Sequence, residues 1–179
     1  MTEDVPLSEP ARLQRVPGDT APVDAPAYDL IELFFFAYRD FVGDPDRILA
    51  DFGFGRAHHR VLHFVDRQSG LTIAELLDIL KITKQSLNRV LKELIEKDFV
   101  EVRTGTQDRR QRLLFTTPQG HELALRLARL QTRRIERALD SGTPDLRDAA
   151  SRFLLAMIDP AERGEVMEIL SGRTKEAAQ

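Results

Sequence analysis

Polar and basic side chains gather between residues 83 and 92 of this 179-residue chain. They are Thr83, Lys84, Gln85, Ser86, Asn88, Arg89 and Lys92. Amide, hydroxyl and guanidinium groups at helical spacing can form hydrogen bonds with base edges, and Lys and Arg can neutralise phosphates. Leu87, Leu91 and Leu94 follow the spacing of a buried helix face. The pattern predicts a helix that buries one side and offers the other to a polar, anionic partner.

A second basic group follows a short distance downstream. It comprises Arg109, Arg110 and Arg112, preceded by Asp108 and by a glycine at position 105. Residues 81–112 hold nine basic and five acidic residues, a net charge of +4, whereas the whole chain carries −3. A nucleic-acid site must therefore be a local patch. An arginine at the tip of a β-hairpin can enter the DNA minor groove, where negative potential is concentrated.

Three histidines, His58, His59 and His63, lie close together in the chain. His59 and His63 are four residues apart, which is a spacing that can bind zinc on a helix. No cysteine is present, and no acid or histidine elsewhere is obviously paired with them. We interpret them as structural residues and keep two alternatives, an effector pocket and a metal-responsive site that uses all three. Their ordinary pKa near 6.5 also allows pH sensitivity.

Enzyme chemistry is not indicated by any motif. The absence of cysteine excludes disulfides, thiol catalysis and thiolate metal sites. Gly53 and Gly55 lack the third glycine and the preceding strand of a dinucleotide site, and no Ser/His/Asp group has a recognisable nucleophile turn. The longest apolar run, 33–38, is far shorter than the ~20 residues of a membrane span, and no apolar leader is evident. We expect a cytoplasmic protein that needs no cofactor, no metal and no membrane, and that is not an enzyme.

Helix and strand signals place the polar face inside a larger unit. Thr72 and Glu75 have the spacing of a capping box, and Thr83 is the expected N-cap of the next helix. Residues 99–103 and 112–116 alternate as two strands of a hairpin with a basic tip. This order predicts a winged helix-turn-helix, in a fold that is mainly α with a small β-hairpin wing and a helical dimerisation region.

The segments on either side of this unit are expected to be helical. Residues 28–42 include Phe34, Phe35 and Phe36, which cannot all face one core because consecutive helix positions differ by about 100°. Contact with a second subunit is the simplest way to bury these phenylalanine side chains. Gly43 is expected to end this helix, and Asp44 to start a short one. The predicted parts are an acidic Pro-rich tail (1–27), dimerisation helices (28–55), the winged domain (56–117), C-terminal dimerisation helices (118–171) and a second tail (172–179).

The segments 71–76, 82–94, 98–100, 108–110 and 114–120 resemble the MarR family of bacterial transcriptional regulators. The Asp-x-Arg wing, followed by a strand and Thr-x-x-Gly, carries much of this resemblance. Residues 53–64 and the Phe-rich first helix are similar to an alphaproteobacterial branch that includes the PetP and LdtR regulators. The chain departs from many members at Asp98-Phe99, where a glycine often follows the recognition helix.

The resemblance implies a triangular homodimer in which two winged domains read a pseudo-palindrome in double-stranded DNA. Asp108 would brace the wing, and Arg110 would enter the minor groove. A small aromatic or anionic effector would bind between the dimer helices and the DNA-binding lobe. The residues expected to line that junction are Phe35, Tyr38, Arg39, His59 and His63. The alternative from another class is a protein-interaction adaptor without specific DNA binding, for which an apolar groove would be more typical than a polar face.

Overall fold

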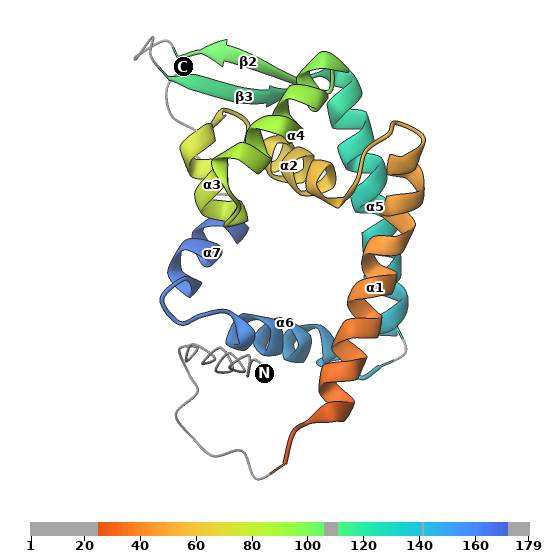
Figure 1. Ribbon diagram of the computed structural model, residues 1–179. Coiled ribbons are helices and arrows are strands. Elements are labelled where there is room, and N and C mark those ends of the chain that lie inside the picture. The colour runs from red at the N-terminus through yellow and green to blue at the C-terminus, as the bar shows by residue number, and fades with distance from the viewer. Residues whose placement is uncertain (1–24, 106–110, 141, 172–179) are drawn as a thin grey trace, which may run out of the picture. The chain divides into compact units, whose positions relative to one another are not determined.

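The computed structural model describes residues 25–105, 111–140 and 142–171 (Figure 1). These residues form seven helices and three strands, so the chain is mainly α with a small antiparallel sheet. The chain divides into two compact units, residues 1–36 and 37–179. The two predicted tails lie wholly or mostly outside the described residues, as does the tip of the hairpin.

The first helix is longer than the sequence indicated. Helix α1 runs without a break from Tyr28 to Ala50, so the expected end at Gly43 was wrong. Gly43 adopts no left-handed φ, and Pro45 lies inside the helix with its side chain fully buried. Asp44 does not cap a new helix, because its carboxylate pairs with Arg47 and Arg134 instead. Burial of the proline ring and these ion pairs offset the backbone hydrogen bond that a proline removes from a helix.

The central part of the chain forms the predicted winged helix-turn-helix order. Its elements are α2 (Arg56–Arg67), β1 (Leu71–Thr72), α3 (Ile73–Leu80), α4 (Lys84–Glu96), β2 (Val100–Thr104) and β3 (Arg112–Thr116). The sheet order is β1-β3-β2, and Leu114 pairs with Leu71 on one side and with Val102 on the other. The short strand β1 was not predicted, since two residues show no alternation.

The junction between the wing and the next helix explains the Thr-x-x-Gly motif. Helix α5 runs from Pro118 to Asp140, and the Gly120 amide donates a 3.1 Å hydrogen bond to Thr117 Oγ1. That hydroxyl donates in turn to the Asp98 carbonyl at 2.6 Å. A Cβ on Gly120 would lie only 1.9 Å from the Phe99 carbonyl oxygen. Residue 120 must therefore be glycine for α5 to pack against the turn that links α4 to β2.

One apolar core joins the elements of the winged domain. Its fully buried leucines come from α1, α2, α3, α4, β3 and α5, and they are Leu49, Leu62, Leu76, Leu87, Leu94, Leu114 and Leu127. The last helices, α6 (Leu146–Met157) and α7 (Arg163–Leu170), bury no residue. Phe35 on α1 is 66% exposed and Phe153 on α6 is 52% exposed. No helix among the described residues is long and apolar enough to cross a membrane.

Candidate nucleic-acid interface

Helix α4 has the two faces that the sequence predicted. Its buried side consists of Leu87, Val90, Leu91 and Leu94. The seven polar residues singled out from the sequence, 83–86, 88, 89 and 92, are all exposed. Figure 1 shows α4 between α3 and the strand β2 that follows it. The fold therefore presents one continuous polar and basic helix face to solvent.

Thr83 and Ser86 also organise the start of α4. The Thr83 hydroxyl accepts a 3.2 Å hydrogen bond from the Ser86 amide and donates to Ser86 Oγ at 3.0 Å. The preceding turn is tight because Lys81 adopts a left-handed φ of 50°. The free amides and positive dipole end of a helix N-terminus favour an anion such as a phosphate.

Two sets of contacts hold helix α3, which precedes this turn in the chain. The predicted capping box forms, since the Glu75 amide donates to Thr72 Oγ1 at 3.2 Å and the Thr72 amide donates to Glu75 Oε2 at 2.8 Å. From α2, Arg60 donates a 2.9 Å hydrogen bond to the Leu80 carbonyl at the end of α3. Sequence patterns do not predict the second contact, because the partner of Arg60 is a backbone oxygen.

The base of the wing is ordered by the pairing of β2 and β3. The Gly105 amide donates to the Gln111 carbonyl at 3.0 Å, and Arg112 is exposed opposite Thr104. The Arg103 guanidinium lies 4.4 Å from the centre of the Phe115 ring. Three of the predicted wing residues, Asp108, Arg109 and Arg110, lie outside the described residues.

The residues expected to line an effector pocket lie on two helices. His59 and His63 are one turn apart on α2, while Tyr38 and Arg39 are adjacent on α1, and Phe35 belongs to the first compact unit. Burial is the main cause that lowers the pKa of His59, with a smaller contribution from the charge of His63. Burial also lowers the pKa of His63. Arg39 pairs with the neighbouring Asp40 at 2.8 Å.

A pocket of about 180 Å³ lies elsewhere, beside α7. Phe64, Ile79 and Val166 contribute to its apolar lining, and Lys81 and Glu162 contribute charges. The Lys81 ammonium lies 3.3 Å from a Glu162 carboxylate oxygen, and this contact is the main cause that raises the pKa of Lys81. None of the residues expected to bind an effector lines this pocket.

The histidine cluster does not form a metal centre in the part of the chain that the structure describes. No three His, Asp or Glu side chains among those residues are placed to hold a metal ion. His58 has both ring nitrogens engaged, with Glu93 Oε2 at 2.9 Å and with the Gly55 amide at 3.2 Å. The metal-responsive alternative therefore has no support from this geometry.

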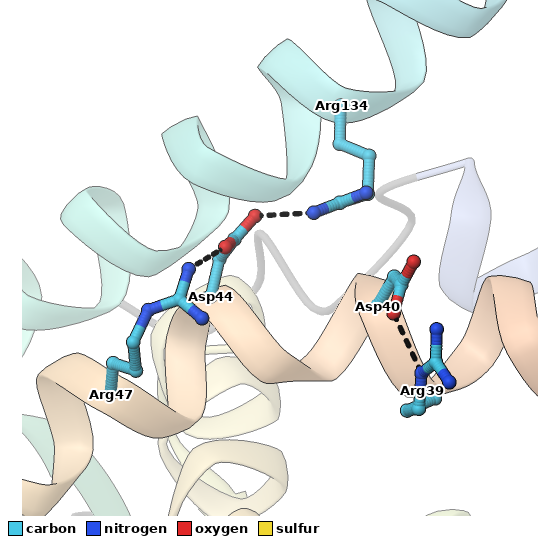
Figure 2. A network of polar contacts seen from close by, with 5 residues as sticks. All are labelled: Arg39, Asp40, Asp44, Arg47 and Arg134. Atoms are coloured by element: carbon cyan, nitrogen blue, oxygen red, sulfur yellow. Dashed lines mark hydrogen bonds and ion pairs between the residues drawn. The ribbon is translucent and has the colours of Figure 1, made fainter.

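An ion-pair network joins α1 to α5 (Figure 2). Asp44 Oδ2 lies 2.8 Å from an Arg134 nitrogen, and its other oxygen pairs with Arg47 on the next turn of α1. The hydrogen bond from Arg134 is the main cause that lowers the pKa of Asp44. Sequence reasoning missed this contact because its partners are 90 positions apart.

Comparisons with known proteins identify the family. A sequence profile described as the MarR family matches residues 52–111. The HTH-type transcriptional regulator PetP of Rhodobacter capsulatus is 47% identical over 133 residues, which cover 74% of this chain and 80% of PetP. This chain belongs to the MarR family. It is a transcriptional regulator from a PetP-like branch, as the resemblance predicted, and not an enzyme.

Solved MarR-family structures share the fold at low sequence identity. The MarR family transcription regulator SP03579 has a TM-score of 0.62 and 17% identity, covering 84% of this chain and 93% of that one. The Staphylococcus aureus MepR–DNA complex has a TM-score of 0.59 and 17% identity, covering 71% of this chain and 94% of MepR. These likenesses confirm the predicted winged-helix fold class.

Proposed function

We propose that this MarR-family regulator binds a specific pseudo-palindromic DNA operator as a homodimer, with α4 in the major groove and the wing in the minor groove. The observation that carries the proposal is the exposed face of α4, on which every polar residue named from the sequence reaches solvent. A helix of this width fits the major groove, and its N-terminal residues are those that reach base edges.

The side chains on this face suit both parts of DNA recognition. Gln85 and Asn88 can pair with adenine, and Arg89 can pair with guanine through two hydrogen bonds. Lys84 and Lys92 can neutralise phosphates. The MepR–DNA complex, which has the same fold, supports this use of the fold.

The exposed apolar residues support the homodimer. Phe34, Phe35 and Phe36 on α1 and Phe153 and Leu154 on α6 are each 46–66% exposed in the single chain. A monomer rarely leaves so much apolar surface uncovered, and a second copy of the chain can cover it. Two recognition helices would then lie about 34 Å apart, one turn of DNA. Light scattering should give twice the chain mass of 20.4 kDa, and a mass of one chain at micromolar concentration would contradict the dimer.

A small aromatic or anionic effector would regulate this dimer, with Tyr38, Arg39, His59 and His63 among its contacts. Such a ligand can act only through different affinities for the DNA-competent and incompetent states. Arg39→Ala should then keep DNA binding and lose release by the effector. If every variant of these residues that loses effector-induced release also loses DNA affinity, the effector site lies elsewhere.

Footprinting across the genome, including the region upstream of the protein's own gene, identifies the sites that the protein binds. A titration then compares one footprinted duplex with a shuffled duplex of equal composition. Specific proteins bind their sites ~10³-fold or more tightly than other DNA. Equal affinity for both duplexes, or no binding, would contradict the proposal and favour the adaptor alternative.

A further inference from the structure

The α1–α2 connection and the first turn of α2 each contact the C-terminal end of the recognition helix. His58 Nε2 lies 2.9 Å from Glu93 Oε2, and Lys97 Nζ donates a 2.6 Å hydrogen bond to the Phe52 carbonyl. Positions 93 and 97 are one turn apart, so both contacts lie on the same flank of α4. We call Phe52, Phe54, His58, Glu93 and Lys97 the α4 anchor.

The hydrogen bonds of His58 define its tautomer. The Gly55 amide donates to Nδ1 at 3.2 Å, so in the neutral ring Nδ1 is the acceptor and Nε2 carries the hydrogen. That hydrogen is donated to the carboxylate of Glu93. Only 12% of the His58 side chain is exposed, so this charge-assisted bond is partly shielded from water.

Aromatic packing fixes the ring of His58 in this orientation. Phe54 stacks on His58 with ring centres 4.7 Å apart, and it meets Phe99 edge-on at 5.0 Å. Lys97 Nζ lies 4.8 Å above the same Phe54 ring. Gly53 has a φ of +69°, and a Cβ there would lie 3.2 Å from Lys97 Nζ. The anchor therefore accounts for Gly53 and Phe54, which DNA contact does not explain, whereas nothing lies within 4 Å of a Cβ at Gly55.

We propose that His58 is a positioning residue that sets the orientation of α4 on DNA through its bond to Glu93. This inference rests on the proposed DNA-binding function. Glu93 and Lys97 lie at one end of α4, and the base-reading residues Lys84 to Arg89 lie at the other, roughly 10 Å away along the helix axis. A small rotation at the anchored end moves the reading residues relative to base edges, where hydrogen bonds tolerate displacements of only a few tenths of an ångström.

The anchor also links α4 to α1. Phe52 lies two residues beyond the end of α1 at Ala50, and the Phe54 amide donates to the Leu49 carbonyl at 2.9 Å. A displacement of the end of α1 therefore reaches α4 through a short, hydrogen-bonded segment. This path gives the regulator a connection from α1 to the recognition helix that does not pass through a ligand pocket.

Two substitutions at position 58 separate positioning from simple stability. His58→Gln places an amide donor close to Nε2 and keeps the bond to Glu93, but removes the acceptor for Gly55. His58→Asn places an oxygen close to Nδ1 and keeps the Gly55 bond, but removes the donor to Glu93. Both lose the ring that stacks on Phe54. Thr116→Val is the control, since it removes the 3.1 Å bond from Thr116 to Asp66 on α2 without touching α4.

The experiment measures operator affinity, shuffled-DNA affinity and melting temperature for each variant. We expect His58→Asn to lose about tenfold in operator affinity, while His58→Gln and Thr116→Val stay within about twofold of wild type. Glu93→Ala should cost nothing further in the His58→Asn background, because the same bond is already absent. Equal operator affinities for His58→Asn and His58→Gln would overturn the proposal. So would a loss of operator affinity that is proportional to the loss of melting temperature across these two variants and Thr116→Val.

Hydrogen exchange without DNA separates failure of the anchor from failure of the proposed function. His58→Asn should speed exchange of the α4 amides at residues 91–97, and His58→Gln should not. If wild type binds no specific DNA, the proposed function fails, and the affinity role of His58 fails with it. If wild type binds but exchange and affinity are unchanged in His58→Asn, the anchor alone is refuted.

Discussion

Arg134 on α5 donates a 2.8 Å hydrogen bond to Asp44 on α1, and this bond holds the pKa of Asp44 below its ordinary value (Figure 2). A carboxylate with a lowered folded pKa stabilises the fold above its unfolded pKa, about 4, and this stabilisation is lost as pH falls through the folded value. Asp44→Asn should therefore lower the melting temperature at neutral pH, and the gap from wild type should narrow below about pH 4. Asp51→Asn, an exposed change nearby, should leave the melting curve unchanged. A gap for Asp44→Asn that stays constant down to pH 3 would contradict this role.

The buried histidine on α2 predicts a second pH effect in a different range. Burial lowers the pKa of His59 in the fold, so the unfolded chain takes up a proton first as pH falls below about 6.5. The contribution of His59 to folding stability is present above about pH 6.5 and is lost as the pH falls through the folded pKa. His59→Gln should weaken the dependence of melting temperature on pH between about 5 and 7. Unlike Asp44→Asn, it should leave the wild-type pH dependence below about pH 4 unchanged. A wild-type curve that is already flat there would contradict the prediction.

Glycine 120 should respond to alanine in the opposite way from an ordinary helix glycine. Gly→Ala inside a helix usually stabilises by about 1 kcal/mol. At Gly120 the new Cβ would overlap the Phe99 carbonyl, so we expect a loss of about 2 kcal/mol or more. Gly43→Ala on α1 is the matched control, because nothing lies within 4 Å of its Cβ. Denaturant unfolding measures both changes, and a Gly120→Ala protein as stable as wild type would show that α5 does not pack as described.

Local sequence signals predicted the parts of the fold that short-range interactions determine. The capping box at Thr72 and Glu75 and the N-cap at Thr83 depend on residues three positions apart, and both form. The buried and exposed faces of α4 follow from helical period alone. Leu71 was the exception, since it pairs with Leu114 in a strand too short to show a pattern.

Long-range contacts were not predictable in the same way. Asp44-Pro45 has the sequence pattern of a helix start. In the structure, however, Asp44 forms an ion pair with Arg134, and Pro45 is buried within α1. The bond between His58 and Glu93 joins residues 35 positions apart, and periodicity carries no information on such pairs. The three neighbouring histidines were interpreted as structural residues, but their spacing did not indicate their partners: the structure pairs His58 with Glu93 on α4 and buries His59.

The wing makes a prediction about salt. Arg110 should neutralise phosphate charge in the minor groove, where base discrimination is weak. Arg110→Ala should weaken operator and shuffled DNA by similar factors and reduce the slope of log affinity against log salt by about one. Asp108→Ala keeps the positive charge, so its slope should not change. Arg137→Ala, an exposed arginine toward the far end of α5, is the control for charge alone. An unchanged slope and affinity for Arg110→Ala would mean that the wing does not touch DNA.

The central claim is that the exposed face of α4 reads base edges, and one titration tests it directly. Wild type, Gln85→Ala and Arg89→Ala are titrated against the footprinted duplex, its single-base variants and the shuffled duplex at one salt concentration. Each alanine should cost about 1–3 kcal/mol on the operator and relax specificity at one base position, with shuffled-DNA affinity far less affected. Wild-type affinity and wild-type base preference in both variants would contradict the account.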